Sequence, residues 1–425
     1  MKSWDRVLEA LARMARQRHM LALRDGMIAA LPVILIGSTF LLLGAQKDVL
    51  TRYFPGLAGS GVGQWYLAHT AQILIPYRLT MGMLSIYMAF TMGASLARQY
   101  DLPPLPQGIG AVVVFLLSTV PSRIPIEPGG APTWVIPLPS LGPEALFLSI
   151  LCGLLTVEAS RVFIKKTTKE PSLEGGVPQA VTDAFASFLP VLLAASVMWG
   201  LRHLVGFDVQ KMLISALKPM ETLGDSMGCV VLVNVALHVF GVAGVHGISV
   251  INAVFLALWQ KFLAENAAAH LAGASIPYIT AYPFYQWFIW AGGAGITLPV
   301  PFILLFSRSG HLRKIGRFGL IPSLFNVNEP ILFGVPIVAN PILAIPFVLA
   351  PVTAGIISFV AVSAGLVGRP FIEVPWVLPC FIGAPLATQD LRSLVLLGIN
   401  LGVSTMIWLP FLKAHERKLM TNEDS

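Results

Sequence analysis

Long stretches of this chain contain no Asp, Glu, Lys or Arg and consist mostly of apolar side chains. One helix needs about 20 such residues to cross the hydrocarbon of a bilayer. The runs that reach or approach this length are 26–46, 79–97, 102–122, 184–201, 226–260, 266–307, 330–368 and 393–412. The pattern predicts an all-α polytopic integral membrane protein, in which several runs are too long to form a single helix.

The apolar runs of the second half are interrupted by residues that break regular helices. Glycines cluster at 241–247 and 292–295, and an Asn-Val-Asn-Glu-Pro segment occupies 326–330. Irregular backbone at membrane depth is tolerated only where it is buried in protein or lines a water-filled cavity, and such interruptions in two comparable segments point to a transporter's substrate site. We therefore predict two re-entrant hairpins, near 236–250 and 320–340.

The position of these hairpins divides the chain into two predicted domains. Residues 1–227 are expected to form an N-terminal membrane domain, which acts as scaffold and dimerisation region and ends in a linker. Residues 228–425 are expected to form the substrate-binding transport domain.

Composition and charge support the membrane assignment. Apolar residues make up 56% of the chain and charged residues only 12%, against about 25% in an ordinary soluble domain. The basic residues gather before the first span and at 161–169, 308–317 and 413–418. The positive-inside rule places these clusters and both termini in the cytoplasm, with four spans (about 27–46, 80–97, 107–122 and 142–162) between the first two clusters. Because the net charge of +7 is divided among loops, it does not indicate a nucleic-acid site.

Two other features limit the possible chemistry. The N-terminal apolar stretch is long and no small-residue cleavage site closes it, so we expect a retained membrane helix and not a signal peptide. Cys152, Cys229 and Cys380 lie in apolar segments without Cys-x-x-Cys spacing. They are expected to be small buried hydrophobes, and no metal site or disulfide is predicted.

Glu329 is the only charged residue between Phe318 and Gly368. An ionisable group at membrane depth costs about 2.5–3.5 kcal/mol on insertion scales, so its presence indicates a functional site. The structural alternative is that Glu329 caps a half-helix or pairs with a neighbour.

Segments along the chain, such as Gln17–Gly26, Val245–Gly247 and Pro322–Gly334, have characteristic sequences. Together they resemble the membrane subunit IIC of phosphotransferase-system (PTS) sugar transporters, in the lactose and cellobiose/diacetylchitobiose family. The similarity is strongest in Pro322–Gly334 and extends over essentially the whole chain. The other segments that carry it are Gln17–Gly26, Leu31–Ser38, Val245–Gly247, Glu265–Ala269, Gly292–Gly295, Val374–Trp376 and Ala387–Asp390.

This resemblance implies a fold, a reaction and partners. It implies a homodimer with about ten spans per chain and two re-entrant hairpins in the bacterial cytoplasmic (inner) membrane. Such a permease carries a β-linked disaccharide inward through the lipid bilayer and releases its 6-phosphate. The phosphoryl group comes from a phosphocysteine on a IIB protein, which is charged by IIA and, through it, by HPr and enzyme I. None of the three cysteines begins a IIB-type phosphate loop, so we expect the donor on a separate chain and no bound cofactor.

The resemblance also implies which residues act. Phosphoryl transfer to a sugar hydroxyl consists mostly of positioning and charge stabilisation, with one group accepting the hydroxyl proton. The catalytic candidates near the sugar C6 hydroxyl are Glu329, as base, and His246, which would hold or share that proton. The implied substrate-binding residues are Asn326, Asn328, Gly247 and Trp376.

Each of these assignments has a structural alternative. His246 could be a packed hairpin residue, as we expect for His238, and the amides of Asn326 and Asn328 could satisfy free backbone groups of the hairpin. Trp376 could be an interfacial anchor. Glu265 and Asn266 are expected to end a helix on a loop.

A second class of function also fits the pattern. A proton-coupled secondary sugar transporter would place a Glu and a His at the membrane midplane as a proton relay. It would deliver unmodified sugar, whereas a PTS permease delivers sugar phosphate. The sequence does not distinguish among cellobiose, lactose, diacetylchitobiose and aryl glucosides.

Overall fold

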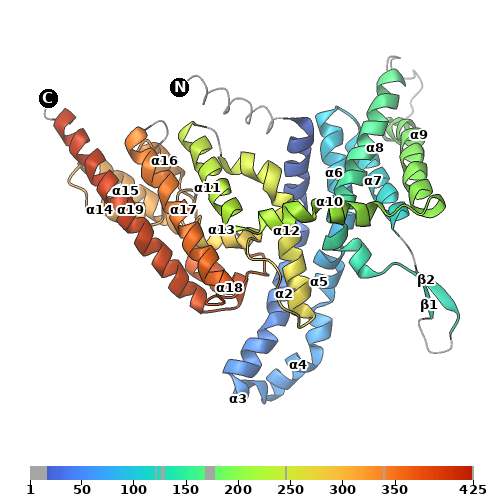
Figure 1. Cartoon of the computed structure of the whole chain (residues 1–425), viewed down its shortest axis with the longest axis horizontal. Helices are drawn as coiled ribbons and strands as arrows, with labels where there is room; N and C mark the ends of the chain where they lie inside the picture. The colour runs from blue at the N-terminus through green and yellow to red at the C-terminus, as the bar shows by residue number, and fades with distance from the viewer. Residues whose placement is uncertain are drawn as a thin grey trace. The chain divides into compact units, whose positions relative to one another are not determined.

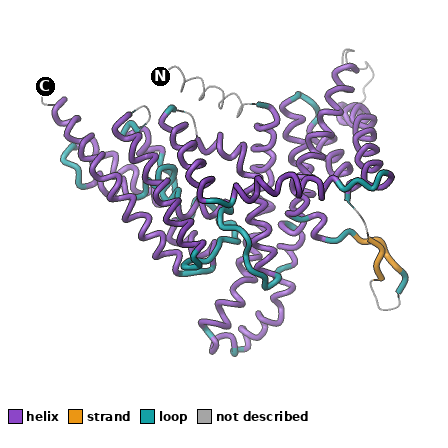
Figure 2. The backbone as a smooth tube through the Cα atoms, viewed as in Figure 1, coloured by secondary structure: helices purple, strands orange, loops and turns teal. Residues whose placement is uncertain are grey.

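The structure is a computed structural model that describes residues 17–119, 122–125, 130–167, 178–244, 247–337 and 340–423. These residues are almost entirely helical (Figure 2) and form two compact units. The first unit comprises the described residues up to Phe40 and those of Gln72–Pro219, and the second comprises Leu41–Ala71 and the described residues from Met220 onward. The second unit thus adds Leu41–Ala71 to the region predicted as a transport domain, and the scaffold and transport roles stay predictions.

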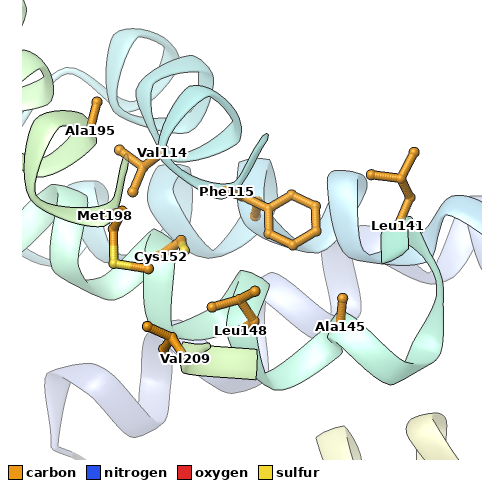
Figure 3. Close-up of a cluster of buried hydrophobic side chains, with 10 residues drawn as sticks. Val114, Phe115, Leu141, Ala145, Leu148, Cys152, Ala195, Met198 and Val209 are labelled. Carbon is orange, nitrogen blue, oxygen red and sulfur yellow. The ribbon is translucent and has the colours of Figure 1, made fainter. Parts of the chain in front are cut away.

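The first unit is a bundle of apolar helices. Figure 3 shows its core, where Phe115 and Val114 pack with Met198 and with Cys152, which is the small buried hydrophobe that the sequence predicts. Its helical elements are the first part of α2 (Arg18–Tyr53), α5 (Ile75–Leu79), η1 (Met81–Met83), α6 (Leu84–Gln99), α7 (Pro104–Ser118), η2 (Leu138–Leu141), η3 (Pro143–Ala145), α8 (Leu146–Thr167), α9 (Gln179–Trp199), η4 (Gly200–Leu204) and most of α10 (Val209–Gly224).

A small β-hairpin departs from the all-helical prediction. Strand β1 (Ser122–Pro125) pairs antiparallel with β2 (Pro132–Val135), with Ser122 opposite Val135. The hairpin follows α7, which ends at Ser118, and only its first residue, Ser122, overlaps the end of the span predicted at about 107–122.

The second unit contains the apolar runs that are interrupted at 241–247, 292–295 and 326–330, and its helices are shown in Figure 1. The hydroxyl of Tyr66 donates to the carbonyl of Leu43, and Gln46 Nε2 donates to Gln389 Oε1 at 3.1 Å, which ties the early segment to this unit. Its helices are the end of α2, α3 (Pro55–Ala58), α4 (Gly61–Ile73), α11 (Met227–Val242), α12 (Gly247–Leu271), α13 (Tyr282–Phe288), α14 (Pro299–Leu305), α15 (Gly310–Leu324), α16 (Glu329–Gly334), α17 (Pro341–Ser363), α18 (Cys380–Thr388) and α19 (Arg392–Glu423).

Side chains and glycines fix the ends of several of these helices. The Ser226 hydroxyl accepts from the backbone N–H of Cys229 at the start of α11, and Asn340 Oδ1 accepts from Ile342 N at the start of α17. Such caps satisfy N–H groups that the first helical turn leaves without partners. Gly365 follows the end of α17 with φ of +71°, a conformation that glycine adopts without strain.

The described helices confirm an all-helical polytopic membrane fold. Those long and apolar enough to cross a bilayer lie within Arg18–Lys47, Pro143–Phe163, Gln179–Leu204, Gly247–Leu271, Pro341–Ser363 and Arg392–Thr421. Two bent pairs, Gly61–Leu79 with Met81–Gln99 and Val209–Gly224 with Met227–Val242, raise the possible number of crossings from six to eight. The resemblance implies about ten, but α7 has only 15 residues, which is short for an independent span.

Candidate substrate site

A cavity of about 480 Å³ lies within the second unit, at the point where its helices are broken. This volume is in the range of small-molecule sites in proteins, about 300–1,000 Å³. The α11–α12 break, α13, the glycine turn at 292–295, the Asn-Glu-Pro segment with α16, α17 and the loop before α18 all contribute to its wall. The lining residues are Leu237, Gly241, Gly244, Gly247, Ile248, Tyr282, Gln286, Trp290, Gly293, Ala294, Asn326, Asn328, Glu329, Leu332, Phe333, Ile337, Phe347 and Trp376.

The second predicted hairpin corresponds to α15, a tight turn and the short helix α16. Asn326 forms the turn with φ of +61°, a left-handed conformation that Asn tolerates better than most residues. The turn places Asn328 in the cavity wall beside Glu329, which is the first residue of α16.

Asn326 uses its whole side-chain amide to hold backbone. Its Oδ1 accepts from Gly292 N at 2.9 Å, and its Nδ2 donates to the carbonyls of Trp376 at 2.7 Å and Leu378 at 2.8 Å. The residue therefore links the glycine turn to the loop that carries Trp376. This is the structural alternative considered for Asn326, and it makes Asn326 a support for the cavity wall.

Asn328 is only partly committed in this way. Its Nδ2 donates to Ala294 O at 2.7 Å and to Thr297 Oγ1 at 3.0 Å. Its Oδ1 has no hydrogen-bond partner among the described residues. This oxygen can therefore accept a hydrogen bond from a ligand hydroxyl.

Glu329 has an exposed side chain that lines the cavity. In the part of the chain that the structure describes, its carboxylate takes part in no ion pair and no hydrogen bond. The alternative that Glu329 pairs with a neighbour is therefore not observed among these residues. Its predicted partner His246 lies outside the described residues, so the pairing of the two stays a prediction.

The first predicted hairpin coincides with the break between α11 and α12. A Cβ at Gly247 would lie 2.0 Å from Leu237 O, so glycine is needed there for close backbone packing, in addition to its place in the cavity wall. His238 on α11 is fully buried, and its two ring nitrogens are engaged: Nδ1 donates to Asn234 O at 2.6 Å and Nε2 accepts from Gly295 N at 2.7 Å. His238 is thus the packed histidine that the sequence suggests.

Trp376 lies in the loop between α17 and α18 and is 50% exposed. Its backbone carbonyl is fixed by Asn326, whereas its indole lines the cavity. The ring is therefore free to stack on the apolar face of a ligand.

Several cavity residues were not anticipated from the sequence. Tyr282, Gln286 and Trp290 come from an aromatic segment inside the apolar run 266–307, and Phe333 and Phe347 from the apolar run 330–368. Uncharged residues in an apolar run give no signal by charge or spacing. Pro283 in the first turn of α13, with Pro277 shortly before it, was a local indication that the run is broken there.

The prediction for Glu265 and Asn266 was wrong. Both residues lie inside α12, where Glu265 pairs with the buried Lys261 at 2.6 Å and Asn266 Nδ2 donates to Tyr278 O and Pro370 O, both at 2.8 Å. Lys261 also pairs with Glu221 at 2.9 Å. A charged residue next to a long apolar run resembles a loop position, but here the charge is buried because partners from α10 and α12 compensate it.

Comparisons with known proteins agree with this fold. The family described as Phosphotransferase system, EIIC matches residues 24–351. The oligo-beta-mannoside-specific EIIC component of Bacillus subtilis (strain 168) is 34% identical over 97% of this chain and 92% of its own length. The cellobiose-specific EIIC component of Geobacillus stearothermophilus is 30% identical over 99% of this chain and 95% of its own.

A solved structure shows the same fold. The crystal structure of the transporter ChbC, the IIC component of the N,N'-diacetylchitobiose-specific phosphotransferase system, superposes with a TM-score of 0.87 and 30% identity, over 99% of this chain and 98% of that one. The sugar phosphotransferase systems to which such components belong take their phosphoryl groups from IIB proteins. The chain therefore belongs to the EIIC family of the phosphotransferase system and is a multi-pass sugar permease of its lactose/cellobiose/chitobiose group.

Proposed function

We propose that this permease binds a β-linked disaccharide in the 480 Å³ cavity, carries it across the cytoplasmic membrane and presents its C6 hydroxyl to the phosphocysteine of a IIB protein. Glu329 acts as the proton acceptor for that hydroxyl, and His246 is its partner. The homodimer and the cytoplasmic placement of both termini are part of the same proposal.

The observation that carries this proposal is the state of Glu329. It is the only carboxylate among the described residues of the cavity wall, and it is exposed and without a protein partner there. A carboxylate in an apolar membrane segment lowers stability when no protein group pairs with it, so its presence indicates a functional role. Its neighbours Asn328 and Trp376 supply a hydrogen-bond acceptor and an aromatic face, which suit a pyranose ring.

Phosphoryl transfer from the phosphocysteine to the sugar needs no group besides the sugar hydroxyl and the Glu329 carboxylate. The C6 oxygen of the sugar attacks phosphorus in line with the departing sulfur, the P–S bond breaks and the cysteine leaves as a thiolate. The hydroxyl proton passes to the Glu329 carboxylate. The protein supplies position and a proton acceptor, which is most of what phosphoryl transfer requires.

The names of the relatives support the substrate class. Components specific for oligo-beta-mannoside, cellobiose, lactose and N,N'-diacetylchitobiose all match the chain. We therefore place the substrate among β-linked disaccharides.

Vesicles that contain only this chain test the coupling. We expect them to equilibrate radiolabelled disaccharide slowly without accumulating it, since the donor that traps the sugar is absent. Rapid filtration with and without an imposed pH gradient gives the measurement. Accumulation driven by the pH gradient alone would identify a proton-coupled transporter and overturn the proposal.

A group of exposed cations precedes the Glu329 segment. We call Arg308, Arg313, Lys314 and Arg317 the basic surface; all four side chains are exposed, and the last three lie on α15, the helix that leads to Asn326. A positive surface attracts an acidic partner and accelerates its docking. We propose that IIB docks here on the cytoplasmic side.

Neutralising the basic surface is expected to weaken this docking. Replacing Arg313, Lys314 and Arg317 together with Gln should raise the apparent KM for phospho-IIB severalfold at low salt and less at high salt, because exposed charges are screened over about 8–10 Å at physiological ionic strength. Sugar affinity should not change. The matched control exchanges Lys and Arg at the same three positions, keeps the charge and should behave as wild type. Equal effects of both triple variants would contradict an electrostatic docking site.

A further inference from the structure

Helix α13 brings two polar side chains to the cavity wall that the reaction above does not use. Tyr282 and Gln286 are four residues apart, so they lie on the same face of the helix, one turn from each other. The proline at 283 in the first turn suits the start of this short helix, which lies between the irregular segment 272–281 and the turns at 289–296.

Neither polar group has a hydrogen-bond partner among the described residues. Gln286 is only 7% exposed, yet its amide makes no hydrogen bond with any described residue, and the hydroxyl of Tyr282 makes none either. The large majority of buried side-chain polar groups in proteins are hydrogen-bonded, because burying an unpartnered amide is costly. Asn326 in the same cavity wall shows the usual behaviour of a buried amide, because both its oxygen and its nitrogen form hydrogen bonds.

The surroundings of this pair fit a sugar. The Gln286 amide can donate and accept, and the Tyr282 hydroxyl can do both as well. The indole of Trp290, whose ring centroid lies 6.3 Å from that of Tyr282, lines the same cavity. Side chains that can form hydrogen bonds with hydroxyls, beside an aromatic surface, suit a pyranose, which has a polar rim and an apolar face.

We propose that Tyr282 and Gln286 form a hydroxyl-binding edge of the disaccharide site, separate from the Asn-Glu-Pro segment, which determines which hydroxyl pattern the permease accepts. The inference rests on the proposed function and adds residues to it. The pair binds hydroxyls that are not phosphorylated, so its contribution is the same in the ground state and the transition state. It therefore acts on KM and specificity and not on the rate of phosphoryl transfer at saturating sugar.

A binding experiment with defined sugars tests this proposal. The purified full-length chain is titrated with cellobiose, β-1,4-mannobiose, lactose and N,N'-diacetylchitobiose, and the sugar with the lowest Kd is followed by its singly deoxygenated analogues. For wild type we expect one or two deoxy positions to raise the Kd by about tenfold, or about 1.4 kcal/mol, since loss of a buried hydrogen bond leaves the protein group unpaired.

Gln286→Leu and Tyr282→Phe are the informative variants. Gln286→Leu should raise the Kd of the parent sugar about tenfold and leave the Kd of one particular deoxy analogue unchanged, so that discrimination at that hydroxyl disappears. Tyr282→Phe should do the same at a different hydroxyl. The maximal rate with phospho-IIB should stay within about twofold for both variants.

Gln107→Leu is the matched control. Gln107 is a fully buried glutamine of the first unit that donates to Ser187 Oγ at 3.0 Å, so its loss costs stability without touching the cavity. It should leave all sugar Kd values unchanged. If Gln286→Leu weakens the parent and every deoxy analogue equally, the role is structural and the inference is overturned. If none of the four sugars binds wild type, the proposed substrate class fails instead.

Discussion

Replacing Glu329 with Gln is expected to lower phosphoryl transfer from phospho-IIB by about 100-fold or more while changing the disaccharide Kd by less than about threefold. Glutamine keeps the shape of the side chain and its ability to accept a hydrogen bond, but it cannot take the hydroxyl proton. Because the Glu329 carboxylate has no partner among the described residues, the substitution should not disturb the surrounding fold. Sugar titration of the purified variant and a transfer assay with labelled phospho-IIB measure the two effects separately.

The matched control for this variant is Glu144→Gln. Glu144 is also an exposed carboxylate in the first turn of a short helix, but it belongs to the first unit. It should leave both binding and transfer unchanged. Undiminished transfer by Glu329→Gln would remove Glu329 from the role of proton acceptor, and loss of binding with a normal maximal rate would make it a sugar ligand.

Replacing Asn326 with Asp should weaken disaccharide binding at least about tenfold. Aspartate keeps the oxygen that accepts from Gly292 N but loses both donated bonds, and its negative charge then faces the carbonyl oxygens of Trp376 and Leu378. The loop that carries the Trp376 indole would lose its anchor. Isothermal titration of protein that remains monodisperse in detergent measures the effect.

Asn340→Asp offers a matched control with the same change of side chain. Among the described residues, the Asn340 side chain forms hydrogen bonds only through its oxygen, which accepts from Ile342 N at 3.0 Å and Leu343 N at 3.3 Å. Aspartate is an equally good residue at this N-terminal cap. This variant should bind sugar as wild type does. Wild-type affinity in Asn326→Asp as well would show that the anchor of the Trp376 loop does not shape the site.

The sequence was sufficient to predict the fold class and several of the segments that line the candidate cavity. Charge-free runs identify membrane helices reliably because charge at membrane depth is costly, and the four spans predicted in the first part all contain helices: α2, α6, α7 and α8. The same rule singled out Glu329, since it is the only charged residue between Phe318 and Gly368. Asn326, Asn328, Gly247 and Trp376 line the cavity with it.

The roles of those side chains were harder to predict. Asn326 could donate to a sugar or to backbone, and the outcome depends on Gly292 and Trp376, which lie 34 and 50 residues away in sequence. Gln286 and Tyr282 gave no signal, because uncharged polar residues within an aromatic run do not alter hydropathy patterns. Glu265 resembled a loop residue for a similar reason: only the folded chain shows that it pairs with the buried Lys261 inside α12.

The most direct test of the central claim is the chemical form of the sugar that this permease delivers. Inside-out vesicles that contain the chain are supplied with labelled disaccharide in the lumen and ³²P-labelled phospho-IIB outside, and the external sugar is analysed by chromatography and NMR. We expect disaccharide phosphorylated at the C6 hydroxyl, carrying the ³²P label, and about 100-fold less of it or lower with Glu329→Gln. Release of unmodified disaccharide at the same rate with or without phospho-IIB, and faster release under a pH gradient, would contradict it.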